Sequence, residues 1–574
     1  MKTKQLLLLF TLLFCFHIPQ IRAQGIDWMK SFGGTDHDNL NASAIDEMGN
    51  IYVCGSFQGT IDMDPGEDEY ILTSSHYYDT FVLKLNKDGE FIHAHSIGGA
   101  AADFAKVIAV DKDLNYYVSG TFDNTVDMDP GPEELIFTAN GDHDIFFQKF
   151  NEAGELQWAF QLKTSTEDDE LRDIAIDEMG NVYCTGEFYY TIDFDPGAST
   201  YNLSSNGRND IFVLKLDADG NFLWAESIGG WYEDYGAQIL IDRFGDLLIG
   251  GSFIDEVDFN PGVDSAVLVS VSVDDAFLLK LTSEGVFKSV KSFGGIANDF
   301  IRYMKFDNEN NIIIGGSFRI EADFDPDPEK EYLVEGGSLN DLFVLKLDEN
   351  GDFMWVRTLG GGFSFVFIKP FDIDSLNNIY FASSFNTSLD IVPGDSSYIV
   401  EPVGSDDFFI DKLGPNGDFI SAFIMGSPYL DYINTVFLDR HANIYAVGVF
   451  NGNPKYELNN TTDSLSSAGS VDVFIQKFVQ TVDTSSNAID EFFGFEVMVY
   501  PNPGNGNFKI QSSDLMPGLY QLKVINGAGQ IVLEREINNT GIFLEEVNLT
   551  GNGVFFIELS LPNHLRIIRK VIVN

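Results

Sequence analysis

Basic residues are scarce in this chain of 574 residues. It contains 34 Lys and Arg against 88 Asp and Glu, and its formal net charge is −54. Binding to nucleic acid is driven by cations that release counterions from phosphates, so this imbalance argues against a nucleic-acid partner. An anionic membrane surface is disfavoured for the same reason, whereas divalent cations, glycans and basic proteins fit the charge.

Cysteines and long hydrophobic runs are also rare. Two of the three cysteines, Cys54 and Cys184, fall one position apart in equivalent strands of a repeat. They would point to opposite faces, so we predict two free thiols. The apolar run over residues 6–16 is too short to span a membrane and predicts a signal peptide over residues 1–23. No transmembrane segment is expected after signal cleavage.

Familiar catalytic motifs are absent as well. The chain has no Gly-x-Ser-x-Gly elbow, no His-Glu-x-x-His pair, no phosphate-binding loop and no Cys-x-x-Cys motif. The sequence therefore favours a protein that is not an enzyme, although it leaves the question open.

What the chain does contain is one unit repeated seven times. Residues 24–480 are 457 residues, or about 65 for each of seven copies. An Asp-x-Phe motif opens an apolar segment in every copy, and a residue present in every copy is interpreted as structural. These residues are Asp79, Asp144, Asp210, Asp275, Asp341, Asp407 and Asp472. A second recurring Asp is also interpreted as scaffold: Asp38, Asp103, Asp169, Asp234, Asp299 and Asp431.

The pattern of each copy predicts two β-hairpins, and turns such as Asp46–Gly49 connect the two strands of a hairpin. No useful helical periodicity is present. Two hairpins make one four-stranded antiparallel blade of a β-propeller. The strand at 28–32 lacks a partner in its own copy, and so does the last repeat strand at 474–478. Pairing these N- and C-terminal strands would close a seven-bladed ring. We therefore predict an all-β protein with a seven-bladed β-propeller over residues 24–480.

An Asp-x-Asp-Pro-Gly block recurs within the copies. Its two carboxylates would lie on one side of an extended segment, where they could ligate Ca²⁺. The alternative, which we favour, is that they accept hydrogen bonds from the turn backbone. The candidate metal residues are Asp62, Asp64, Asp127, Asp129, Asp193, Asp195, Asp258, Asn260, Asp323 and Asp325.

The fourth copy differs from the others in its aromatic residues Trp231, Tyr232 and Tyr235. Aromatic rings with a polar edge can stack on sugars, so a glycan could bind here. Packing of surface loops is the alternative.

The segment Asp-x-x-Gly-Asn-Ile-Tyr-Val-x-Gly-Ser-Phe resembles the SBBP-type β-propeller repeats of exported bacterial proteins. This resemblance implies a fold more firmly than an activity.

The C-terminal part of the chain has a different character. A polar linker is predicted over residues 481–494, followed by a small β-sandwich over residues 495–574. Its opening motif, Pro501-Asn502-Pro503 with Gly506, and its basic-then-apolar last strand resemble the C-terminal sorting domain of the type IX (Por) secretion system. The resemblance implies handling by the type IX machinery and a secreted or outer cell-surface location.

Together these features predict a non-enzymatic function. We expect a monomeric, exported β-propeller that binds or adheres to a glycan or protein ligand. The alternative is an extracellular hydrolase or lyase acting on polysaccharide at the propeller channel. That activity would require acid, base and cation groups from different blades to converge near the axis. The sequence leaves open the ligand, the cleavage point before the sorting domain, and whether the protein is released or stays attached.

Overall fold

The computed structural model describes residues 25–573 with several gaps. The segments outside the description are 1–24, 141–142, 164–168, 364–367, 392–398, 459–460, 470, 480–497, 501–506, 513–517, 527–530, 540–542, 550–552, 561–565 and 574. Every secondary-structure element among the described residues is a β-strand, which confirms the predicted all-β class. No membrane-spanning helix is found in that part of the chain. The predicted signal peptide, the linker and the motif Pro501-Asn502-Pro503 with Gly506 lie outside the described residues.

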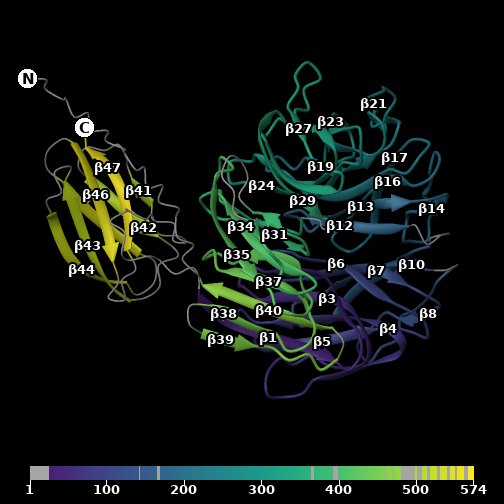
Figure 1. Cartoon of the computed structure of the whole chain (residues 1–574), viewed down its shortest axis with the longest axis horizontal. Helices are drawn as coiled ribbons and strands as arrows, with labels where there is room; N and C mark the ends of the chain where they lie inside the picture. Colours follow the sequence, from purple (N-terminus) through teal and green to yellow (C-terminus); the bar gives the residue numbers. More distant parts are fainter. Residues whose placement is uncertain are drawn as a thin grey trace, which may run out of the picture.

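The strands of the repeat region fall into seven groups of four antiparallel strands, which we number as sheets 1 to 7 in chain order (Figure 1). Further pairing joins groups 1 and 7 into one eight-stranded sheet and extends group 4 to six strands. Sheet 1 contains β2 (Asp38–Ile45), β3 (Ile51–Asp62), β4 (Ile71–Leu85) and β5 (Phe91–Ile97). Sheet 2 contains β6 (Phe104–Val110), β7 (Tyr116–Phe122), β10 (Asp144–Phe150) and β11 (Leu156–Leu162). Sheet 3 contains β12 (Glu170–Ile176), β13 (Val182–Phe188), β16 (Asp210–Leu216) and β17 (Phe222–Ile228).

The remaining four sheets follow the same order. Sheet 4 contains β18 (Tyr235–Ile241), β19 (Leu247–Phe253), β22 (Asp275–Leu281) and β23 (Phe287–Gly295). Sheet 5 contains β24 (Phe300–Phe306), β25 (Ile312–Phe318), β28 (Asn340–Leu347) and β29 (Phe353–Phe363). Sheet 6 contains β30 (Asp372–Ile373), β31 (Ile379–Phe385), β34 (Asp407–Leu413) and β35 (Phe419–Met425). Sheet 7 contains β36 (Asp431–Leu438), β37 (Ile444–Phe450), β40 (Asp472–Val479) and β1 (Gly25–Gly34).

A short hairpin lies between the second and third strands of most sheets. In sheet 1 this hairpin continues the long strands β3 and β4. The separate hairpins are β8 (Thr125–Asp127) with β9 (Ile136–Thr138), β14 (Thr191–Asp193) with β15 (Asn202–Ser204), β20 (Glu256–Asp258) with β21 (Val267–Val269), β32 (Leu389–Asp390) with β33 (Ile399–Val400), and β38 (Lys455–Leu458) with β39 (Thr461–Ser464). The hairpin of β26 (Glu321–Asp323) with β27 (Leu333–Glu335) also pairs with β23 of sheet 4.

The Asp-x-x-Gly sequences form the predicted turns. Asp46 Oδ1 accepts the backbone N–H groups of Met48 and Asn50 at 2.9 and 2.8 Å. Gly49 has a φ of 87°, a conformation that is costly for residues with a Cβ atom. The side chain of Asp46 and the freedom of Gly49 therefore fix the hairpin between β2 and β3.

The first and last strands of the repeat region pair with each other, as the sequence predicted. In the register of β1 and β40, Trp28 lies opposite Lys477 and Phe32 lies opposite Val473. β1 completes sheet 7, and its end also pairs with β3 of sheet 1 through Gly33 and Asp62. This pairing covers the edge of β40 that would otherwise be exposed.

Side-chain interactions link the first strand of each sheet to the first strand of the next, and we call these strands the first-strand circle. Seven side-chain interactions link them in turn: Asn41 to the carbonyl of Ala105, Lys106 to Glu170, Asp173 to the N–H of Ile239, Gln238 to the N–H of Met304, Lys305 to Asp372, Asp372 to the N–H of Leu438, and Asn434 to the carbonyl of Leu40. The last of these returns to β2, where the first began.

The hydrophobic core lies between neighbouring sheets. The second strands, such as β7 and β13, are buried along their whole length because both of their faces are covered. The core cluster between sheets 2 and 3 joins Phe147 of β10 to Cys184 of β13 and Phe212 of β16. Cys54 and Cys184 are buried free thiols, which confirms that prediction.

Residues 498–573 form two further antiparallel sheets. One contains β41 (Met498–Tyr500), β42 (Asn507–Ser512) and β45 (Phe543–Asn548). The other contains β44 (Ile531–Asn539), β43 (Gly518–Asn526), β46 (Gly553–Ser560) and β47 (Arg566–Val573). Phe508 and Val547 of the first share one core with Leu522 and Ile557 of the second. Two sheets packed through a common apolar core constitute a small sandwich.

Candidate functional site

The Asp of each Asp-x-Phe motif ties a strand to the loop before it. In all seven sheets its Oδ2 accepts the backbone N–H of the residue four positions earlier, at 2.6–3.1 Å. These seven side chains are at most 6% exposed. The geometry fits a structural role, because a buried carboxylate must be hydrogen-bonded to be tolerated.

The second recurring Asp lies at the start of the first strand. The Oδ2 atoms of Asp38, Asp103, Asp234 and Asp299 each accept the N–H of a glycine four residues earlier, at 2.6–2.8 Å. Burial raises the pKa of Asp38 and Asp103 to about 7 and that of Asp234 and Asp299 to about 8, against the effect of these hydrogen bonds. These residues position the first strand and do not face an open site.

The Asp-x-Asp-Pro-Gly blocks use their carboxylates within the turn. Asp62 Oδ1 accepts the N–H groups of Asp64 and Tyr70 at 3.1 and 2.9 Å, and Asp64 Oδ1 accepts that of Gly66 at 2.7 Å. The same bonds recur at Asp127, Asp129, Asp193, Asp195, Asp258, Asn260, Asp323 and Asp325. Within the described ranges, no group of three or more His, Cys, Asp or Glu is arranged to hold a metal ion. Turn capping accounts for these residues, and Ca²⁺ binding stays a prediction.

A β-bulge occurs at one equivalent position in six of the seven first strands. The pairing register skips one residue there. Side chains of a regular strand alternate between the two faces of the sheet, and the bulge points the side chain of the extra residue in a different direction. The bulged residues are Asn41, Lys106, Arg172, Ala237, Arg302 and Asn434. Three of the six are cations and none is an acid, although the chain has more than twice as many acids as cations.

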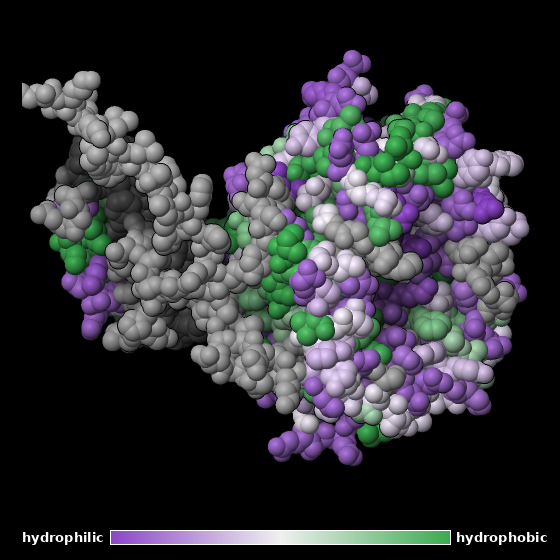
Figure 2. Space-filling model, in the orientation of Figure 1, coloured by the Kyte–Doolittle hydropathy of each residue, from purple (hydrophilic) through white to green (hydrophobic). Residues whose placement is uncertain are grey.

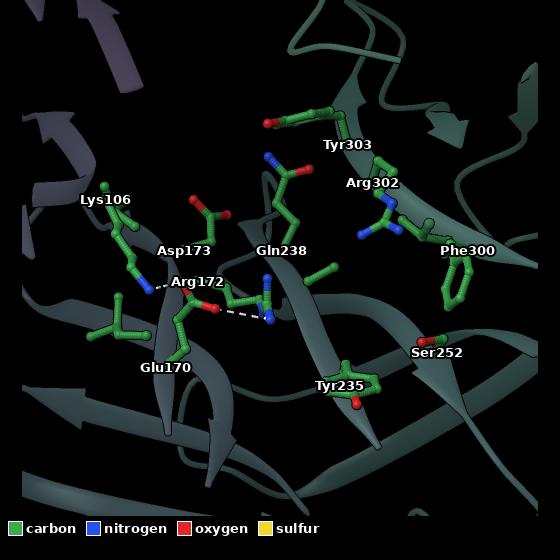
Figure 3. A pocket seen from close by; sticks show the side chains of 14 residues that line it. Lys106, Glu170, Arg172, Asp173, Tyr235, Gln238, Ser252, Phe300, Arg302 and Tyr303 are labelled. Atoms are coloured by element: carbon green, nitrogen blue, oxygen red, sulfur yellow. Dashed lines mark ion pairs between the residues drawn. The ribbon is translucent and has the colours of Figure 1, made fainter. Parts of the chain in front are cut away.

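A cavity of about 470 Å³ opens between the first strands β6, β12, β18 and β24. Figure 3 shows its labelled side chains around a common space; Ser252 comes from β19, and the other labelled residues come from β6, β12, β18 and β24. The charged side chains that line it are Lys106, Glu170, Arg172, Asp173 and Arg302, and Tyr235, Phe300 and Tyr303 add aromatic rings. The volume falls within the range of roughly 300–1,000 Å³ that is typical of small-molecule sites.

Arg172 is the centre of an ion-pair network at this cavity. Its guanidinium forms a two-point contact with Glu187 of β13, at 2.5–2.9 Å, and lies 2.9 Å from Glu170. Lys106 reaches Glu170 from the neighbouring strand at 2.6 Å. Burial alone would raise the pKa of Glu170, but the charges of Arg172 and Lys106 outweigh it and the pKa is lowered. Glu170 is therefore an ionised carboxylate held between two cations.

Arg302 places a second guanidinium group in the same cavity. Its guanidinium lies over the ring of Phe300, 4.7 Å from the ring centroid, and that of Arg172 lies 6.0 Å from the centroid of Tyr235. Burial lowers the pKa of Arg302 to about 10, and the positive charge of Arg172 contributes to this shift. Two guanidinium groups in one cavity favour a ligand that carries negative charge.

The sequence analysis found only part of this site. It singled out Tyr235, which lines the cavity, together with Trp231 and Tyr232, whose side chains are exposed. It did not find Lys106, Arg172 or Arg302, because these residues match no motif. The available signal was positional: in the aligned repeats they follow the second recurring Asp by three residues, a position that varies between copies.

A second surface feature is an apolar patch on the hairpin β20–β21. Alternation along β21 turns Leu268 toward the core and leaves Val267 and Val269 exposed, and Val263 and Val271 extend this surface. Hydrophobic residues are visible over β21 in Figure 2. Equivalent hairpins carry a polar residue at the position of Val269, for example Ser204 in β15, whereas the position of Val267 is hydrophobic in most of them, for example Ile136 in β9 and Leu333 in β27.

Comparison with known proteins identifies the C-terminal module. The family of the secretion system C-terminal sorting domain matches residues 498–574. This confirms the predicted sorting domain, although the boundary at residue 495 and the SBBP-type assignment of the repeats stay predictions.

Matches to the rest of the chain are distant. The chain is 22% identical over 475 residues to an uncharacterized WD repeat-containing protein, L264, of Acanthamoeba polyphaga mimivirus, a match that covers 74% of this chain and 31% of the relative. It is 22% identical over 316 residues to the regulatory protein FlaEY of Caulobacter vibrioides, covering 52% and 30%. The matches thus span about a third of the length of these curated relatives.

Among solved structures, the extracellular domain of BT4673 from B. thetaiotaomicron is 9% identical, with 95% of this chain and 98% of that chain covered and a TM-score of 0.18. The sorting domain indicates the destination: this chain is secreted through the type IX system or held at the outer cell surface.

Proposed function

We propose that residues 24–480 form a seven-bladed β-propeller that acts outside the cell as a non-enzymatic binding or adhesion module. In this proposal the seven sheets are the blades, the pairing of β1 with β40 closes the ring, and the circle of first strands surrounds a central channel. The ligand enters the cavity between β6, β12, β18 and β24, which lies at the mouth of that channel. Residues 481–494 are then the linker to a sorting domain that begins at residue 495.

The observation that carries the proposal is the convergence of unlike side chains on one cavity. The scaffold Asp residues are the same in nearly every sheet, whereas Lys106, Arg172, Ala237 and Arg302 occupy one equivalent position and differ in chemistry. A ligand without sevenfold symmetry requires such variation. Residues that only hold the sheets together do not.

Binding is favoured over catalysis by the state of the carboxylates. Glu170 is ionised between two cations, and Glu187 is held by Arg172. Burial raises the pKa of Asp173 to about 7, but its carboxylate accepts the N–H of Ile239 at 2.9 Å. Glycoside hydrolysis requires one carboxylic acid and one carboxylate aimed at the substrate, and these three groups are already engaged.

The test is to fill the cavity without changing its charge. Ala237→Trp would place an indole at the bulged position of β18, among the lining residues. We expect the exported protein to bind a subset of a panel of glycans and extracellular proteins, and the variant to lose this binding while its thermal unfolding is unchanged. Equal binding by both proteins would refute the cavity as the ligand site.

The competing function is a polysaccharide hydrolase or lyase, and the convergence of Lys106, Glu170, Arg172 and the tyrosines in one cavity is the observation that favours it. Incubation with polysaccharides would then release reducing ends or unsaturated products, and Arg302→Gln and Tyr303→Phe would abolish the release. If the protein releases these products faster than buffer alone does, the enzyme proposal replaces the binding proposal.

Two roles are open to the Asp-x-Asp-Pro-Gly blocks, Ca²⁺ binding and turn capping, and we favour turn capping. If the blocks bind Ca²⁺, the ion would stabilise the folded state by mass action, and addition of Ca²⁺ would raise the melting temperature while a chelator would lower it. If the carboxylates only cap turns, as we expect, neither change occurs.

A further inference from the structure

The cations at the circle of first strands extend beyond the cavity itself. Sheet 6 lacks the second recurring Asp, but its Lys369 stands nine residues before Asn378, as Lys106, Arg172 and Arg302 stand nine residues before the equivalent Asn of their own copies. The Nζ atom of Lys369 lies 4.6 Å from the centroid of the Tyr432 ring, in the first strand of sheet 7. Four of the seven equivalent positions are therefore basic. Two of the others, Asn41 and Asn434, use their amides to bind neighbouring strands.

Aromatic rings accompany these cations. Arg172 faces Tyr235, Arg302 faces Phe300 and Lys369 faces Tyr432, so each is a cation–π pair with a ring from the first-strand circle. In the cavity, Tyr235 and Phe300 are partly exposed. A site with guanidinium groups beside accessible aromatic faces offers two kinds of recognition at once: charge-assisted hydrogen bonds and stacking on an apolar ring face.

The exported location narrows the ligand class. A secreted or cell-surface protein meets the glycans of its surroundings, and sugars present both an apolar C–H face and, in acidic glycans, an oxyanion. The net charge of −54 opposes the approach of a long polyanion, but charges farther than about 8–10 Å are screened at physiological salt. The local cations therefore determine the preference of the cavity.

We propose that the cavity binds an acidic sugar, whose carboxylate or sulfate group is held by Arg172 and Arg302 while its ring lies against Tyr235 or Phe300. This inference rests on the proposed binding function and specifies its ligand. The other charged groups at the cavity have partners of their own. Lys106 and Arg172 pair with Glu170, and Arg172 also pairs with Glu187. Asp173 accepts the N–H of Ile239, and Asp274, an acid near Arg302, accepts a hydrogen bond from Asn298 at 2.6 Å.

Calorimetric titration of the full exported protein tests the proposal with three oligosaccharides of equal length. One is an oligogalacturonate, which carries carboxylates, one is a sulfated oligogalactan, and the third is the uncharged oligogalactan. We expect one of the two charged ligands to bind about tenfold or more tightly than the neutral one, the advantage expected of a charge-assisted hydrogen-bond pair. The comparison of the two charged ligands distinguishes carboxylate from sulfate.

Variants assign the effect to the cavity. Arg302→Gln should weaken binding of the charged ligand about tenfold or more and leave the neutral ligand unaffected. Lys112→Gln is the matched control, because it removes the same charge from an exposed side chain outside the cavity, and it should change nothing. If Arg302→Gln does not fold, Ala237→Glu adds a repelling charge at the bulged position of β18 and should also abolish binding of the charged ligand.

The outcomes separate the two levels of the proposal. Equal binding of charged and neutral sugars, lost in Ala237→Trp but not in Arg302→Gln, would overturn the acidic-sugar inference and leave the binding function intact. Absence of glycan binding, together with a protein ligand that Ala237→Trp fails to release, would overturn both.

Discussion

Two parts of the first-strand circle carry different residues at the bulged position. We call β2 and β36, where the chain closes, the closing arc, and β6, β12 and β24, which line the cavity, the cavity arc. On the arc where the chain closes, the bulged residues of β2 and β36 are Asn41 and Asn434, and each donates a hydrogen bond to a carbonyl of a neighbouring first strand. On the opposite arc, β6, β12 and β24 carry Lys106, Arg172 and Arg302, which line a cavity. The backbone geometry is the same in both arcs, so the fold does not dictate charge at this position.

The difference separates amides that only join neighbouring first strands from cations that also line a cavity. At the closing arc the amide side chains substitute for backbone pairing between sheets. At the cavity arc an additional acid, Glu187, occupies the position where sheet 4 has Ser252, and it stabilises Arg172. The scaffold has thus been modified in sheet 3 to accommodate a cation.

The largest effect is expected from opening the closing arc. Deleting residues 25–34 removes β1, leaves the edge of β40 unpaired, and exposes the apolar side chains of Phe474 and Val473. We expect loss of the cooperative thermal transition and aggregation, because an unpaired apolar edge strand recruits other chains. Circular dichroism melting and size-exclusion chromatography measure this. A monomeric protein with an unchanged melting curve would contradict the closure.

The second effect concerns the cavity arc. Arg172→Met leaves the carboxylate of Glu187, whose side chain is only 2% exposed, without its partner. The side chain of Arg172 is 37% exposed, so the pair is only half-buried, and leaving Glu187 unpaired should lower the free energy of unfolding in urea by about 1–3 kcal/mol. The double variant Arg172→Met/Glu187→Ser restores the residue type found in sheet 4 and should recover most of the loss. Failure of this rescue would show that Arg172 stabilises the fold by other means.

A pH titration compares the scaffold of the two arcs. Because burial raises the pKa of Asp38 to about 7 and of Asp299 to about 8, these groups hold a proton in the folded state that they lose on unfolding. Their stabilising contribution is complete below pH 4 and is lost as pH rises through the folded pKa. Between about pH 4 and its folded pKa, each of these two Asp residues should lower the free energy of unfolding by about 1 kcal/mol for every unit that the pH rises.

The free energy of unfolding should be measured between pH 6.5 and 8.5. Below pH 6.5 the buried His93 and His95 make the protein more stable as the pH rises, because burial lowers their pKa to about 4 and 3. Asp299→Asn should reduce the slope above pH 7 more than Asp38→Asn does. Equal slopes in the two variants and the parent protein would indicate that neither Asp changes its protonation.

The smallest effect is expected at Asn434. Asn434→Ala removes the 2.8 Å hydrogen bond to the carbonyl of Leu40 and should cost about 1 kcal/mol of stability. Affinity for any cavity ligand should not change, since this residue is on the closing arc. A large loss of affinity with little loss of stability would reverse the assignment of the two arcs.

Repetition in the sequence was sufficient to predict the framework of the molecule. The period of about 65 residues, the turn residues such as Asp46 and Gly49, and the unpartnered strand at 28–32 led to four-stranded units and to the pairing of β1 with β40. These are local patterns, or patterns that a single alignment of the copies reveals. The C-terminal module was predicted over residues 495–574 from its resemblance to a sorting domain, and the family match covers residues 498–574.

The sequence by itself determined the four long strands of each copy, their turns and the export of the chain, because each of these depends on residues close together or repeated in register. It did not predict the short hairpins such as β8 with β9. Only the tertiary structure decided the site. Lys106, Arg172 and Arg302 are more than 60 residues apart from one another, and nothing in their local sequence indicates a shared cavity. Their convergence arises because bulges in separate strands turn these side chains toward one space when the seven sheets pack together.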